Sequence, residues 1–145
     1  MRKLNTGTGN YDLHQTLTGD TFTGYSCISG DAEFLAIGGD NKYRISKLNS
    51  GTGQYDEIND LTLTGAVRNC EFSNDKTFFF IGSKHTFIYK YDGSLYQTHQ
   101  TLTTVGNVTS PAIDFVHPYL LVPSKNAGGV VIVDFLEHNS NSDQW

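Results

Sequence analysis

The feature that most constrains the fold of this chain is an internal repeat with a period of about 44 residues. The segment Lys3–Asp12 returns as Lys47–Asp56 with two conservative changes, an offset of 44 residues. The segment Tyr11–Thr18 returns in part as Tyr96–Thr103, an offset of 85 residues, or about two periods. A strand-rich repeat of roughly 40–45 residues is typical of one propeller blade. The chain is therefore expected to fold as consecutive copies of one small β unit.

Each repeat divides into short strands separated by turn-forming residues. The strands predicted for the three units are 25–29, 34–38, 43–48 and 55–64; 67–73, 77–82, 86–91 and 95–103; and 108–115, 119–122 and 129–135. Asp92-Gly93 is a strong hairpin signal, and the Gly-Thr-Gly segments at 7–9 and 51–53 take the same place in other units. With 9 Phe and 8 Tyr, the composition also favours strands. The predicted fold class is all-β: about three four-stranded antiparallel propeller blades in an incomplete ring.

These repeats resemble the WD-repeat (WD40-like) β-propeller family, in a degenerate form, over about Lys3–Phe135. The Gly of the family's Gly-His pair stands before each innermost strand, at Gly19, Gly65 and Gly106, but the His is missing each time. The family's Trp-Asp position falls at Leu4-Asn5, Leu48-Asn49, Tyr91-Asp92 and Phe135-Leu136. WD repeats and another propeller class of similar blade length are both compatible with this pattern. Either implies a rigid ring of blades that displays its loops.

Counting strands gives a little over three blades, whereas propellers typically close with four to eight. Residues 1–136 are predicted to form a partial propeller and residues 137–145 a frayed polar tail. The chain is expected to begin in the third strand of one blade, at Lys3–Asn5, with 10–18 as the outer strand of that blade. The missing blades would come from a longer parent chain or from a second copy.

Charge and residue spacing exclude several function classes. The net charge is −5 and no Lys/Arg cluster occurs, so nucleic acid is not an expected partner. The apolar runs are too short to span a membrane and no secretory leader is visible, which predicts a cytoplasmic protein. No His or Cys pair has metal-ligand spacing, and neither Gly-Thr-Gly segment precedes a helix, so no metal or cofactor is expected. Cys27 and Cys70 are predicted to be small buried hydrophobic residues.

Two functions from different classes remain. The favoured prediction is a non-catalytic protein–protein interaction scaffold; the alternative is a ligand-binding or enzymatic propeller with a site at the central channel. The innermost strands carry only scattered polar residues and no repeated pattern, which favours the scaffold. Partners are expected to bind the loops entering each innermost strand and those between the second and third strands. The candidate residues there are Phe22, Asn41, Arg68, Lys84, His85 and Lys125.

Large apolar side chains are expected to fill the space between neighbouring blades. The residues predicted for this core are Phe34, Ile37, Ile45, Leu48, Phe72, Phe78, Phe80, Ile88, Tyr91, Leu121, Ile132 and Phe135.

Overall fold

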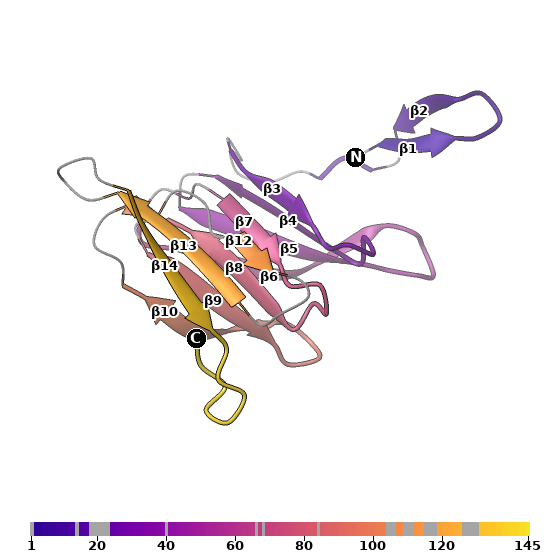
Figure 1. The fold of residues 1–145 in the computed structure, drawn as a ribbon. Helices are drawn as coiled ribbons and strands as arrows, with labels where there is room; N and C mark the ends of the chain where they lie inside the picture. Colours follow the sequence, from indigo (N-terminus) through magenta and orange to yellow (C-terminus); the bar gives the residue numbers. More distant parts are fainter. Residues whose placement is uncertain are drawn as a thin grey trace.

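The structure is a computed structural model that describes residues 2–13, 15–17, 24–39, 41–65, 67, 69–83, 85–103, 107–108, 112–114, 119–125 and 131–145. Over these residues the fold is all-β, with strands arranged in four antiparallel sheets and no helix (Figure 1). The predicted fold class of consecutive antiparallel blades is confirmed.

The strands follow the repeat along the chain. A hairpin of β1 (Arg2–Asn5) and β2 (Asn10–Leu13) stands apart from the other sheets in Figure 1. The first blade contains β3 (Ser26–Ile28), β4 (Phe34–Gly39), β5 (Lys42–Leu48) and β6 (Tyr55–Thr62), paired in that order. The second blade contains β7 (Asn69–Phe72), β8 (Phe78–Gly82), β9 (Thr86–Tyr91) and β10 (Tyr96–Leu102), also in sequence order.

The third blade departs from the predicted pattern. Its innermost strand, expected over 108–115, consists of β11 (Asn107–Val108) and β12 (Ala112–Asp114), and both pair with β13 (Tyr119–Lys125). On its other edge β13 pairs with β14 (Val131–Glu137). β13 extends beyond its predicted end because its pairing with β14 continues through Pro123–Val133 to Lys125–Val131. β14 extends beyond its predicted end because Glu137 pairs with Tyr119 at the start of β13.

A hydrophobic core lies between each pair of neighbouring blades, and β8 contributes side chains to both cores. All five residues of β8 are buried, and successive side chains of a strand point to opposite faces of its sheet. Phe79 and Ile81 pack toward the first blade, whereas Phe78 and Phe80 pack toward the third. The core facing the first blade includes Phe34, Ala36, Tyr43, Ile45, Cys70, Phe72, Tyr89 and Tyr96. The core facing the third blade includes Ile88, Leu120 and Val122.

Six of the residues predicted for the core are buried, and three others are only half-buried. Buried as predicted are Phe34, Ile45, Phe72, Phe78, Phe80 and Ile88. Half-buried instead are Ile37, Leu48 and Tyr91; Ile37 lies on the face of β4 away from the second blade. The predicted side chains of Leu121, Ile132 and Phe135 lie outside the described set. Tyr43, Tyr89 and Tyr96 were not predicted, and all three are buried.

The prediction of a frayed tail is wrong. After β14, Asn139–Gln144 forms a turn that shares two hydrogen bonds with Asn49–Gln54 in the first blade. In each turn the backbone N–H of the Asn donates a 2.7 Å hydrogen bond to the backbone carbonyl of the Gln. Each Asn Oδ1 also accepts a hydrogen bond of 3.0 Å from the N–H two residues later. Within the repeat, the equivalent of Leu48-Asn49 in the third blade is therefore His138-Asn139, and not the expected Phe135-Leu136.

The last residue, Trp145, packs into the core between the second and third blades. Its ring centroid lies 5.9 Å from that of Phe78 and 5.6 Å from that of Phe80. Tyr96 has the equivalent contact with Phe34 one blade earlier, at 5.5 Å. A repeated aromatic contact thus joins successive blades, and it extends to the final residue of the sequence.

Within the described residues, no helix is long and apolar enough to cross a membrane.

Candidate functional site

The turns between the second and third strands of the blades lie at one end of each sheet. Asn41 lies in the turn from β4 to β5, and His85 lies at the equivalent place between β8 and β9, 44 residues later. The backbone N–H of Leu63, just after β6, donates a 2.7 Å hydrogen bond to the carbonyl of Asn41. The segment leading to the next blade therefore lies at this same end. We call the end formed by Asn41, Leu63–Gly65 and His85 the turn face.

The structure brings two predicted interaction residues to the turn face. Asn41 is exposed there. His85 is half-buried: its ring lies 6.2 Å from the Phe87 ring, and its buried Nδ1 has no hydrogen-bond partner among the described residues. Lys125 was predicted in a loop, but it ends β13 and pairs with Asn107 and Val131. The expected loop position of Lys125 is wrong, because the β13–β14 ladder continues to this residue.

Three other predicted interaction residues cannot be placed on the turn face. Phe22, Arg68 and Lys84 lie outside the described residues.

Sequence reasoning missed a repeated contact that joins neighbouring blades, which we call the amide clamp. The side chain of Asn59 in β6 accepts a 2.6 Å hydrogen bond from the Tyr96 N–H and donates one of 3.2 Å to the Tyr96 carbonyl. Gln100 in β10 makes the same pair of bonds to Trp145, at 2.9 and 3.0 Å. Each amide thus satisfies both backbone groups of an aromatic residue in the following blade.

A third amide clamp ties the chain after the N-terminal hairpin to the first blade. Gln15 accepts a 2.8 Å bond from the Tyr55 N–H, and its amide donates a 3.0 Å bond to the Tyr55 carbonyl. The sequence does carry a signal for the three clamps. Each amide follows an aromatic residue by four positions, after Tyr11, Tyr55 and Tyr96. The partner of each amide depends on the neighbouring blade, so the repeat alone did not identify it.

At the end of the blades opposite the turn face, an ion pair joins the first and second blades. Lys76, in the turn between β7 and β8, lies 2.7 Å from a carboxylate oxygen of Asp31 and 2.6 Å from one of Glu33. These hydrogen bonds to Lys76 hold the pKa of Asp31 well below its usual range and lower the pKa of Glu33. The turns of adjacent blades are therefore fixed relative to each other.

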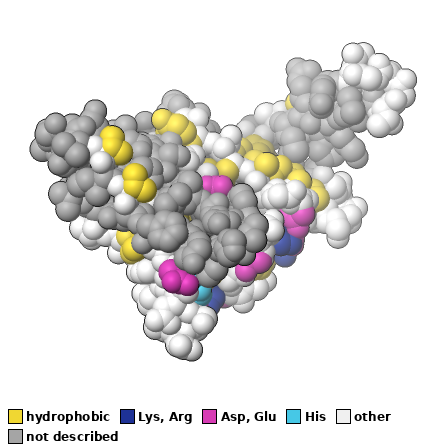
Figure 2. Space-filling view, viewed as in Figure 1, with side chains coloured by type: hydrophobic (Ala, Val, Ile, Leu, Met, Phe, Trp, Pro, Cys, Tyr) yellow, Lys and Arg dark blue, Asp and Glu magenta, His cyan; other side chains and the backbone are white. Residues whose placement is uncertain are grey.

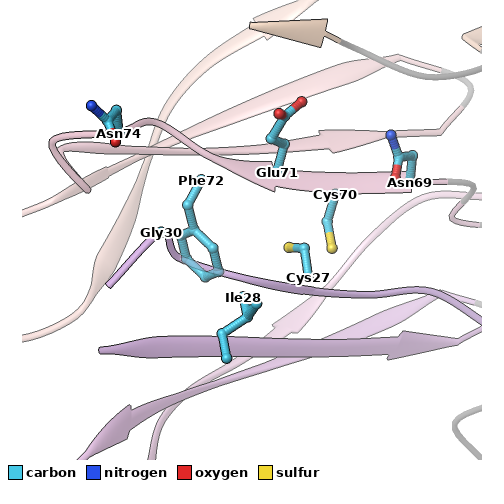
Figure 3. Close-up of a pocket in the computed structure, with 8 residues that line it drawn as sticks. All are labelled: Cys27, Ile28, Gly30, Asn69, Cys70, Glu71, Phe72 and Asn74. Atoms are coloured by element: carbon cyan, nitrogen blue, oxygen red, sulfur yellow. The ribbon is translucent and has the colours of Figure 1, made fainter. Parts of the chain in front are cut away.

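A pocket of about 420 Å³ lies where the innermost strands of the first two blades meet (Figure 3). The residues that line it are Cys27, Ile28, Gly30, Asn69, Cys70, Glu71, Phe72 and Asn74. Cys70 is buried as predicted, with an exposed fraction of 4%, whereas Cys27 is half-buried. Figure 3 shows their sulfur atoms facing one another. Burial, and then the neighbouring Cys70 thiol, raises the pKa of Cys27.

The described residues contain no group of three or more His, Cys, Asp or Glu side chains arranged to hold a metal ion. The functional groups that line the pocket include two thiols, from Cys27 and Cys70, and beside them the amide of Asn69 and the carboxylate of Glu71.

No protein-family model matches the sequence, and no curated protein matches it significantly. Solved structures do match the fold. One is the crystal structure of a "putative 6-phosphogluconolactonase" from Bacteroides uniformis, with a TM-score of 0.70 and 11% identity. That match covers 99% of this chain and 48% of the other.

Two further matches are WD40 propeller proteins. A chain of the mitotic checkpoint complex matches with a TM-score of 0.58 and 13% identity, over 78% of this chain and 36% of that one. The structure of U3-55K matches with a TM-score of 0.61 and 14% identity, over 87% of this chain and 42% of that one. The chain therefore has the fold of β-propeller blades, and it spans less than half the length of each of these three matched chains.

Proposed function

We propose that this chain is a non-catalytic interaction scaffold of WD40-like blades that binds other proteins through its turn face. One observation carries the proposal: equivalent turns of successive blades present Asn41 and His85 at the same end. Binding residues are often found on loops held by a rigid scaffold. The amide clamps and the Lys76 ion pairs supply that rigidity between blades.

The WD40-like assignment is supported by the hairpins that follow the third strands. Asn49 and Asp92 stand where the family has the Asp of its Trp-Asp pair. The Asp92 carboxylate accepts hydrogen bonds from the N–H groups of Ser94 and Leu95, and Asn49 accepts an equivalent bond from Gly51. The two free thiols fit a reducing compartment, so the cytoplasm is the proposed location.

Apolar side chains on the outward faces of the first and third blades support the proposal that further blades pack against them. On the first blade, Ser26, Ile28, Leu35 and Ile37 line an apolar groove of about 420 Å³, together with Thr16 and Leu17 of the segment before β3. On the third blade, Val131 and Val133 in β14 are 65% and 55% exposed. Figure 2 shows apolar side chains at the surface on both flanks of the molecule. We propose that blades from a longer parent chain or from a second copy cover these faces.

Site-specific photo-crosslinking tests the turn face. A benzophenone amino acid is placed at Asn41 in one variant and at Thr52 in the matched control; both positions are exposed turns, and Thr52 lies in the β5–β6 turn at the opposite end. In cell extract, the Asn41 variant is expected to give discrete protein adducts that the Thr52 variant does not give. Equal labelling from the two positions, or no adduct from Asn41, would contradict the proposal.

The pocket between the innermost strands favours a second candidate function, a ligand-binding or enzymatic propeller. Asn69 and Glu71 bring an amide and a carboxylate to that pocket, and one matched structure is described as that of a "putative 6-phosphogluconolactonase". An assay of 6-phosphogluconolactone hydrolysis separates the two functions. The scaffold proposal predicts no turnover, whereas turnover that Glu71→Gln abolishes would favour the enzyme.

A further inference from the structure

We propose that Cys27 and Cys70 form a dithiol modification site, which low-molecular-weight disulfides oxidise to a bond linking the innermost strands of two adjacent blades. Cys27 lies in β3, two residues before Ser29, and Cys70 lies in β7, three residues before Ser73, which is the equivalent of Ser29 in the second blade. Because the side chains of a strand alternate between its two faces, this shift of one residue places the two cysteines on opposite faces of successive blades. Both are free thiols. Because β3 and β7 belong to different sheets, the bond would join blades that no backbone ladder joins directly.

The geometry brings the two sulfur atoms together. Residue pairs between β3 and β7 have Cα atoms within 8 Å of each other. In Figure 3 the two side chains extend toward one another from their strands, and the sulfur atoms meet between the ribbons. The Cys70 thiol is one of the neighbouring groups that raise the pKa of Cys27, after burial. The two thiols therefore face each other at the interface between the first two blades.

The pocket supplies a route for the oxidant. It holds about 420 Å³ and is lined by both cysteines, with the polar side chains of Asn69, Glu71 and Asn74 around them. Cys27 is the more exposed of the two sulfur-bearing residues, since Cys70 has an exposed fraction of only 4%. A small disulfide is expected to reach Cys27 first, and Cys70 then resolves the product.

The chemistry proceeds by two exchanges. The Cys27 thiol loses its proton, and the thiolate attacks one sulfur of the small disulfide; that disulfide bond breaks and one small thiolate leaves. The Cys70 thiolate then attacks the Cys27 sulfur of the mixed disulfide and releases the second small thiol. The protein loses two protons and two electrons, and the small disulfide gains them as two thiols. The raised pKa of Cys27 keeps its thiolate scarce, so the first exchange is slow at neutral pH.

The test uses the native full chain, oxidised glutathione and mass spectrometry after non-reducing trypsin digestion. Trypsin places Cys27 in the peptide 4–42 and Cys70 in the peptide 69–76. The expected product is these two peptides joined, with the intact chain lighter by two hydrogen masses. The rate should rise about tenfold per pH unit while the pH stays below the thiol pKa.

Two variants and a stability measurement complete the test. Cys27→Ser and Cys70→Ser should give no joined peptide, and Cys27→Ser should react more slowly than Cys70→Ser, whose product should retain glutathione. The oxidised native chain should show a Tm raised by about 5–15 °C, and dithiothreitol should reverse the shift. The proposal is overturned if the native chain keeps both thiols, carries only glutathione adducts, or links different molecules through these cysteines.

Discussion

Gly38 in β4 shows how one residue position determines the packing inside the first blade. The Tyr43 ring of β5 lies against it, and a Cβ added at Gly38 would lie 2.5 Å from that ring. Tyr43 is fully buried, so its ring cannot move aside without disturbing the core between the first two blades. The requirement for glycine at this position is therefore steric.

Replacing Gly38 by alanine is expected to destabilise the chain by about 1–3 kcal/mol, the usual cost of overpacking a filled core. Gly24→Ala is the matched control, because its added Cβ would meet its nearest neighbour, the Gly38 carbonyl oxygen, at an ordinary 3.6 Å. Urea denaturation followed by circular dichroism measures both variants. Equal unfolding free energies for Gly38→Ala and Gly24→Ala would show that the Tyr43 ring does not restrict this position.

At the scale of strands and turns, each amide clamp uses one polar side chain, so we expect the stability of each blade interface to depend on that side chain. Asn59→Ala removes both hydrogen bonds to the Tyr96 backbone and leaves those groups without the side-chain partner. The expected loss is about 1–3 kcal/mol of unfolding free energy. Asn59→Gln is the control, because Gln15 and Gln100 fill the equivalent place in other repeats. The clamp is unimportant if chemical denaturation gives the same stability for Asn59→Ala and the parent chain.

The ion pairs between adjacent turns predict a loss of stability in acid. The pKa values of Asp31 and Glu33 are lowered in the folded chain, first by hydrogen bonds to Lys76. A lowered folded-state pKa stabilises the fold above the unfolded pKa, and this contribution is lost as the pH falls through the folded value. The Tm should therefore decline below about pH 4, where free Asp and Glu begin to take up protons.

Lys76→Met separates this effect from the titration of other carboxyl groups. The variant should have a lower Tm at pH 7 and a smaller decline between pH 5 and pH 2 than the parent chain. If the two acid profiles are parallel, Lys76 does not couple to Asp31 and Glu33 in solution.

The strand boundaries were largely predictable because turn chemistry is local. Asp92 and Gly93 specify their hairpin regardless of the blade beside it, and the Asp92 carboxylate accepts hydrogen bonds from the N–H groups of Ser94 and Leu95 within the turn. The blade contacts were not predictable in this way, because Asn59 meets Tyr96 only after two sheets stack. The same reason explains why the facing thiols in the pocket were missed.

At the scale of the whole molecule, three stacked blades have two outward faces. The face of the first blade carries the groove at Leu35 and Ile37, and the third blade exposes Val131 and Val133 on β14. β14 pairs only with β13 among the described strands, so its second edge is available for further pairing. Exposed apolar faces and strand edges promote association with other β structure.

Sedimentation velocity over a range of concentrations tests most directly whether these blades are part of a larger assembly. The 145-residue chain is expected to sediment as a species larger than 16.0 kDa, with a mass that rises with concentration. A Val131→Lys, Val133→Lys variant should shift toward the monomer, whereas Thr52→Lys, at an exposed turn, should not. A folded monomer of 16.0 kDa at every concentration, with cooperative melting and no binding of an apolar dye, would contradict the account.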